Sequence, residues 1–176
     1  MERVTVKTFS LTQIAVLVAL GVVLPALFHV LGIAGNVFLP MHFPALLGGF
    51  LLPNVGSAFL LGAVLPLLNF LLLGMPAFPI FLPMMVELGS YGALVALFHH
   101  RMQSFAALFM ALLLGRGVYL GASWFILGVL LGRQFSFYLS LQNLFVTALP
   151  GMVLQLMLIP LIVKRMKGDT GKHFHR

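Results

Sequence analysis

The stretch Phe9–Leu31, FSLTQIAVLVALGVVLPALFHVL, decides the fold class of this chain. It contains no aspartate, glutamate, lysine or arginine. About 20 consecutive apolar residues are enough to cross the hydrocarbon core of a bilayer. Further apolar runs follow, and no small-residue cleavage site ends this one, so we interpret it as a membrane helix and not as a removable signal peptide.

The composition of the whole chain supports the same interpretation. Of the 176 residues, 61% are hydrophobic and only 7% are charged, whereas about a quarter of the residues of a typical soluble domain are charged. The chain has no cysteine, which excludes disulfides, iron–sulfur clusters and thiolate metal sites. We therefore expect an integral membrane protein with the lipid bilayer as its surroundings, with no metal, no cofactor and no nucleic-acid partner.

Glycine, proline and charged residues divide the apolar material into six predicted helices. The expected ranges are 9–31, 40–52, 56–73, 80–98, 105–131 and 137–163. These ranges predict an all-α integral membrane fold, a compact bundle of six transmembrane helices. Residues 1–165 form the single membrane domain in this prediction, and residues 166–176 form a polar cytoplasmic tail.

Basic residues predict the orientation of the bundle. They precede the first predicted helix, separate the fourth from the fifth, and follow the sixth: Arg3, Lys7, His99, His100, Arg101, Lys164, Arg165 and Lys167. With six crossings all of these positions fall on one face, and the positive-inside rule places that face in the cytoplasm. We therefore expect both termini to be cytoplasmic and attribute the formal net charge of +7 to topology.

Most polar and large aromatic side chains of the predicted helices fall in their outer halves. A polar group in hydrocarbon is costly unless it has a partner or lines a wet cavity, and aromatic rings with a few amides suit a flat heterocycle. This asymmetry predicts a pocket that is open to the outside and closed toward the cytoplasm. The candidate substrate-binding residues are His42, Asn69, Glu87, Tyr91, Arg116, Tyr119, Trp124, Tyr138, Gln142 and Asn143.

Two residues of opposite charge stand out among these candidates. Glu87 is the only acidic residue within the predicted membrane helices, and Arg116 is the only arginine or lysine deep inside one. Glu87 is expected to accept a hydrogen bond from ligand N–H or O–H groups. The alternative is that Glu87 and Arg116 pair and fasten the fourth helix to the fifth. For Arg116 we favour the structural role, and the two roles can coexist.

Small residues on the first helix suggest a contact surface. Ala15 and Ala19 have the small-xxx-small spacing that permits close approach of membrane helices, either within this bundle or against a partner. The chain has no P-loop, no series of titratable membrane residues and no inverted repeat, so it shows no energy source of its own. A pocket without an energy source implies that the energy comes from other subunits.

Two alternatives belong to other functional classes. The segment Gly121-Ala122-Ser123-Trp124 is similar to the serine motif of rhomboid-type intramembrane proteases, but such chemistry needs a histidine base, and the sixth predicted helix contains none. We therefore expect no catalytic residues and no enzymatic activity. A structural or assembly role in a membrane complex is the second alternative.

Three segments resemble the S components of energy-coupling factor (ECF) transporters. These segments are Phe38–Leu52 (FLPMHFPALLGGFLL), Met84–Gly92 (MMVELGSYG) and Gly115–Tyr119 (GRGVY). The sequence departs from the family pattern at Leu52-Pro53-Asn54, where a Gly-Pro ending is expected. The resemblance covers most of the chain, from the first helix to the sixth.

The resemblance implies a substrate-binding subunit in a bacterial cell membrane. Its site would lie near the outer face, formed by the first loop and helices four to six, and its partners would be a membrane coupling (T) subunit and two cytosolic ATPases. Ala15 and Ala19 match the coupling contact of the family on helix one. The substrate would be a vitamin or vitamin precursor, and Glu87 favours a small heteroaromatic one. Arg116 would make an acid such as pantothenate a candidate if it reaches the pocket.

Overall fold

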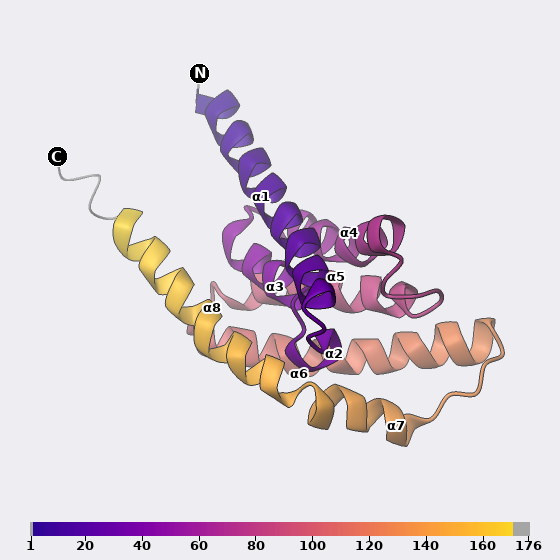
Figure 1. Cartoon of the computed structure of the whole chain (residues 1–176). Helices are drawn as coiled ribbons and strands as arrows, with labels where there is room; N and C mark the ends of the chain where they lie inside the picture. Colours follow the sequence, from indigo (N-terminus) through magenta and orange to yellow (C-terminus); the bar gives the residue numbers. More distant parts are fainter. Residues whose placement is uncertain (1, 171–176) are drawn as a thin grey trace.

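The computed structural model describes the backbone of residues 2–170 and the side chains of residues 11–166. The regular elements of this part are all helical (Figure 1). Two of them are π-helical: η1 (Trp124–Leu130) continues α6, and η2 (Gln142–Thr147) continues α7. The α-helices are α1 (Glu2–Val30), α2 (Gly35–Phe38), α3 (His42–Leu51), α4 (Val55–Leu73), α5 (Phe81–Phe98), α6 (Ser104–Ser123), α7 (Phe137–Leu141) and α8 (Leu149–Thr170).

Five helical segments among the described residues are long and apolar enough to cross a membrane. They are Leu11–Val30, Val55–Leu73, Phe81–Phe98, Ser104–Leu130 and Leu149–Met166. The predicted all-α membrane fold is therefore confirmed. The backbone of α8 continues as helix to Thr170, inside the predicted tail, whose last residues, 171–176, lie outside the described part.

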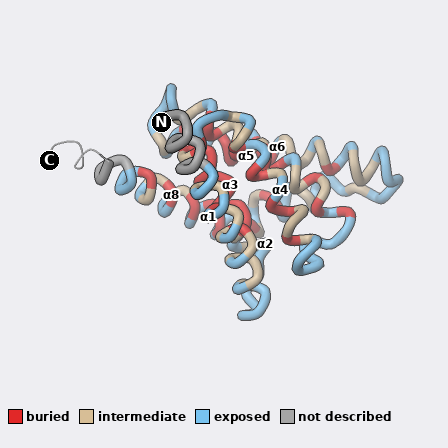
Figure 2. Tube along the Cα trace, turned by 90° about the horizontal axis from the view of Figure 1, so that it is seen from above, coloured by how far each residue is buried: buried red, intermediate tan, exposed pale blue. Residues whose placement is uncertain are grey.

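The second predicted helix is much shorter than the others. Helix α3 has 10 residues, which at 1.5 Å per residue span about 15 Å, half of a hydrocarbon core. Pro44 lies in its first turn, and Pro53 follows its end at Leu51. Most of its residues are buried, and it contacts α1, α4, α5 and α8. It is thus the central element of the bundle, and Figure 2 shows buried positions concentrated around it.

The last predicted helix is interrupted. Residues 137–163 were expected to form one helix, whereas the chain forms α7, the π-helical η2 and then α8. Pro150 explains the interruption, because proline cannot donate a backbone hydrogen bond to the preceding turn and its ring crowds the carbonyl four residues earlier. The interruption changes the directions in which the side chains before and after it point.

Glycine contacts bring α3, α4 and α5 close together. A Cβ atom added to Gly62 of α4 would collide with the backbone carbonyl of Leu88 on α5, and one added to Gly92 of α5 would collide with the carbonyl of Ala58 on α4. Membrane helices associate through such close backbone approach, since lipid provides no hydrophobic drive between them. Asn69 adds a polar tie, because its Nδ2 donates to the carbonyl of Gly21 at 2.8 Å and joins α4 to α1.

We predict that Gly62→Ala lowers stability, because the added methyl group must push α4 away from α5. Overpacking of this kind costs about 1–3 kcal/mol, which is measurable as a lower midpoint of thermal unfolding in detergent. Gly117→Ala is the matched control, since Gly117 is also helical and an added Cβ there meets no atom within 4 Å. Equal midpoints for the two variants would contradict the close contact.

Candidate functional site

A cavity of about 550 Å³ lies where several elements meet at one end of the bundle. It is bordered by the end of α1, the segment 33–42, the loop between α4 and α5, the first half of α5, and parts of α6, α7 and η2. The basic residues His99, His100 and Arg101 follow the opposite end of α5. The cavity and this basic segment therefore lie at opposite ends of α5.

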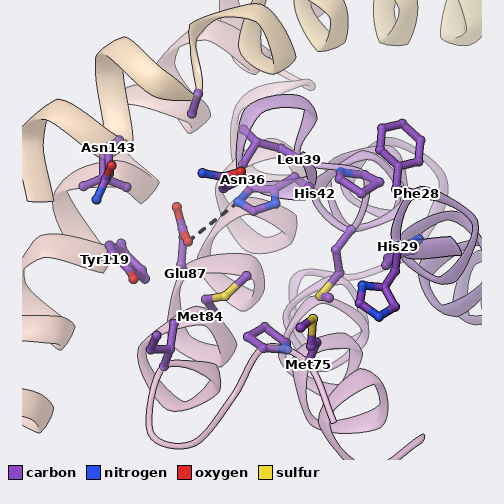
Figure 3. A pocket seen from close by; sticks show the side chains of 18 of the residues that line it. Phe28, His29, Asn36, Leu39, His42, Met75, Met84, Glu87, Tyr119 and Asn143 are labelled. Carbon is purple, nitrogen blue, oxygen red and sulfur yellow. Dashed lines mark ion pairs between the residues drawn. The ribbon is translucent and has the colours of Figure 1, made fainter. Parts of the chain in front are cut away.

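The polar centre of the cavity is a buried cluster around Glu87. Glu87 and Tyr91 are one turn apart on α5, and the Tyr91 hydroxyl donates to Glu87 Oε1 at 2.9 Å. Arg116 Nη1, on α6, donates to the same oxygen at 3.0 Å. His42, the first residue of α3, places Nε2 at 3.7 Å from Glu87 Oε2 (Figure 3). Side chains of three helices therefore meet at one carboxylate.

The local sequence explains how these side chains meet. The i, i+4 spacing puts Glu87 and Tyr91 on the same face of α5. Gly115 lies against the ring of Tyr91, and a Cβ at this position would overlap that ring. The next residue is Arg116, so the glycine that accepts the tyrosine ring also brings the guanidinium within reach of Glu87.

Several polar atoms of the cluster have no hydrogen-bond partner among the described residues. They are both ring nitrogens of His42 and atoms Nε and Nη2 of Arg116. The 3.7 Å separation between His42 and Glu87 exceeds hydrogen-bond length, so Glu87 Oε2 also receives no hydrogen bond from these residues. Buried polar groups are costly when they are left unpaired. The cluster is thus equipped to bind a molecule that both donates and accepts hydrogen bonds.

The lining of the cavity is mostly apolar, with polar side chains on both sides (Figure 3). Figure 3 shows Glu87, Tyr119 and Asn143 on one side, and Phe28, His29 and Met75 on the other. The remaining lining is largely apolar: Pro25, Ile33, Leu39, Pro40, Met41, Leu73, Pro76, Ile80, Met84, Leu144 and Ala148. An apolar cavity with a few convergent polar groups is the usual form of a small-molecule site.

The structure brings together half of the predicted substrate-binding residues. Five of them line the cavity: His42, Glu87, Arg116, Tyr119 and Asn143. Tyr91 is buried behind Glu87 and supports it through the hydrogen bond described above.

The other four candidates do not line the cavity. Asn69 is buried and binds backbone carbonyls of α1 and α4. Trp124 and Tyr138 have 48% and 75% of their surface exposed, and Gln142 is also exposed. These last three residues lie in or next to the π-helical segments. The sequence predicted how deep they lie in the membrane but not whether their side chains point toward the cavity.

Three polar lining residues were not among the predicted candidates: His29, Asn36 and Ser140. His29 belongs to the last turn of α1, and its place near the outer end of an apolar run was a usable signal. Asn36 lies in the short helix α2 between α1 and α3, where no periodicity in the sequence indicates a direction.

The serine of the protease-like segment has no catalytic partner among the described residues. Ser123 Oγ is buried and has no hydrogen bond to a histidine within the part of the chain that the structure describes. A serine nucleophile requires such a base within hydrogen-bond reach, so the described residues do not assemble this machinery.

Comparison with known proteins identifies the family. A family model described as ECF transporter, substrate-specific component, matches residues 9–163. No curated protein and no solved structure matches the chain significantly. The match extends from α1 into α8 and includes every residue of the cluster around Glu87. The chain therefore belongs to the substrate-specific components of ECF transporters, and it is a multi-pass membrane protein.

Proposed function

We propose that this subunit captures a small heteroaromatic vitamin or vitamin precursor in the cavity around Glu87, for ATP-driven uptake into a bacterial cell. The observation that carries the proposal is the buried Glu87–Arg116–His42 cluster, whose free donors and acceptor border a largely apolar cavity. The role requires binding and release of the substrate and no catalysis.

The charges of the cluster favour one kind of ligand edge. The hydrogen bonds from Tyr91 and Arg116 go to Glu87 Oε1 and the His42 contact to Oε2 is long, so Oε2 could accept from a ligand N–H group. Arg116 Nη2 and Nε have no partner among the described residues and could donate to a ligand acceptor. A ring edge with a neighbouring donor and acceptor, as in an aminopyrimidine or a lactam, would satisfy both residues. A carboxylate ligand would instead bring a second negative charge close to Glu87, where a low dielectric strengthens repulsion.

The shape of the cavity agrees with this ligand class. Its volume of about 550 Å³ falls within the range of cavities that hold drug-sized molecules, about 300–1,000 Å³. Phe28 and the sulfur-containing side chains of Met41, Met75 and Met84 offer soft apolar surfaces to a flat ring. The polar edge would then face Glu87 while the ring body lies against these side chains.

The topology supports capture from outside the cell. The positive-inside rule places the basic segment after α5 in the cytoplasm, and the cavity borders the opposite end of that helix. Substrate would enter from the outer face of the bacterial cell membrane. Release to the inside would require the membrane coupling subunit and two cytosolic ATPases.

Helix α1 is the surface that we assign to the coupling subunit. It is the least buried of the five long apolar segments, and both Ala15 and Ala19 are exposed on it. Small exposed residues let a partner helix approach closely. The two alanines would therefore contribute to transport through assembly and not through substrate binding.

The purified protein should be stabilised, without ATP, by one member of a panel of thiamine, its pyrimidine precursor, riboflavin, pyridoxine and pantothenate. A ligand present at 100 times its dissociation constant adds about 2.7 kcal/mol to the stability of the folded state, which thermal-shift measurements detect. Absence of any stabilisation would contradict the proposed function. Stabilisation by pantothenate alone would contradict the heteroaromatic ligand class.

Glu87→Gln should weaken binding of the stabilising vitamin by about 10- to 100-fold, since a hydrogen bond to a charged group contributes about 1.5–3 kcal/mol. It should also lower the unfolding midpoint, because Arg116 loses its buried counterion. The double variant Glu87→Gln/Arg116→Gln should recover stability but not affinity. Isothermal titration measures the affinity, with Gln103→Ala, which lies outside the cavity, as the control. Unchanged affinity in Glu87→Gln would leave Glu87 with a structural role only.

Ala15→Trp and Ala19→Trp should abolish vitamin uptake by cells that carry the complete transporter, while the purified variants keep wild-type affinity. The bulky side chains would prevent close approach of the coupling subunit. Leu71→Trp is the matched control, because Leu71 is an exposed apolar residue on a different helix, α4. If uptake survives in both alanine variants, the coupling surface lies elsewhere.

A further inference from the structure

We propose that Gln155 of α8 is a positioning residue that holds the segment Leu39–His42 in the place where it lines the cavity. That this role affects ligand binding rests on the proposed function. The contact between Gln155 and Leu39 and the test of its role do not depend on it. Gln155 lies on α8 and does not line the cavity. Any influence that it has on a ligand must therefore pass through the segment that it holds.

The carbonyl of Leu39 is the point of attachment. Gln155 has only 1% of its surface exposed, and its Nε2 donates to Leu39 O at 3.2 Å across 116 positions of sequence. The same carbonyl accepts the backbone N–H of His42 at 3.0 Å. One oxygen thus joins α8 to the first residue of α3, whose imidazole faces Glu87.

The backbone at Leu39 needs external support. Its φ of 53° is in the left-handed region, which is uncommon for a residue other than glycine and persists where surrounding contacts hold it. Among the described residues, Gln155 provides the one side-chain hydrogen bond to this carbonyl. Gln155 Oε1 has no partner among the described residues, so the hydrogen bond of this amide is the one that Nε2 donates to Leu39 O.

A second contact on α8 acts on the same segment. Gly151 lies one turn before Gln155, and a Cβ added to it would lie 2.6 Å from Val37 O and 2.7 Å from Phe38 O. Real Cβ atoms do not approach backbone atoms this closely, so α8 can lie against α2 only because residue 151 is glycine. Gly151 sets how close α2 comes to α8 (Figure 1), and Gln155 then holds the carbonyl that follows α2.

The consequence concerns the wall of the cavity. Leu39, Pro40, Met41 and His42 all line it, and the attachment to α8 fixes where this wall stands relative to Glu87 on α5. Loss of the attachment should let the segment move outward and expose side chains that are buried when it is in place. Met41, with 6% of its surface exposed, is such a side chain.

The absence of native cysteine allows a direct test on the full chain in detergent. Met41→Cys provides a single thiol, and a polyethylene-glycol maleimide too bulky to enter the cavity reports its exposure by a gel shift. Adding Gln155→Met, which removes the donor at similar volume, should raise the labelling rate about fivefold or more, as expected for loss of one buried hydrogen bond. Gly151→Ala should also raise it, because the added methyl group displaces α2.

Asn54→Ala is the matched control for general destabilisation. It removes the cap that Asn54 Oδ1 provides by accepting from Ser57 N at 2.7 Å, at the start of α4, and does not touch α2 or α8. It should lower the unfolding midpoint without accelerating the labelling. Unchanged labelling in both α8 variants would overturn the proposal, and so would equal acceleration in Asn54→Ala. Because no vitamin is used, failure of the proposed ligand class would leave this result standing.

Discussion

The buried ion pair between Glu87 and Arg116 is the interaction on which the arrangement of this protein depends. Neither charge is stable alone in a hydrocarbon environment, and removal of one partner would leave the other uncompensated. Their 3.0 Å contact therefore holds α5 and α6 in one relative position. The tyrosine behind the carboxylate extends this constraint along α5, and the histidine at the start of α3 lies 3.7 Å from the second carboxylate oxygen.

Glycine makes this arrangement possible at the level of the backbone. The ion pair requires α6 to approach α5 closely, and Gly115 provides the space that the ring of Tyr91 occupies. The same principle operates between α4 and α5, where Gly62 and Gly92 each face a backbone carbonyl of the other helix. These contacts fix the helices that surround the cavity, although lipid provides no hydrophobic driving force for the helices to associate.

The sequence predicted the elements of this structure better than the directions of its side chains. Apolar runs gave the membrane class and the approximate helices, and the scarcity of charge within them drew attention to Glu87 and Arg116. Trp124 and Tyr138 show why side-chain directions could not be predicted from the sequence. The π-helical turns near them alter the rotation of the helix without leaving a periodic signal in the sequence. Gln155 was missed because its partner is a backbone carbonyl 116 positions away, which no local pattern reveals.

The pairing of Glu87 with Arg116 also has an electrical consequence. Moving one elementary charge across a membrane potential involves about 2.3 kcal/mol for each 100 mV, but a site whose carboxylate and guanidinium compensate each other carries no net charge across that field. Transport of an uncharged solute by this site would then require no work against the membrane potential. Under the proposed function, uptake of such a solute would not change when the cell is depolarised.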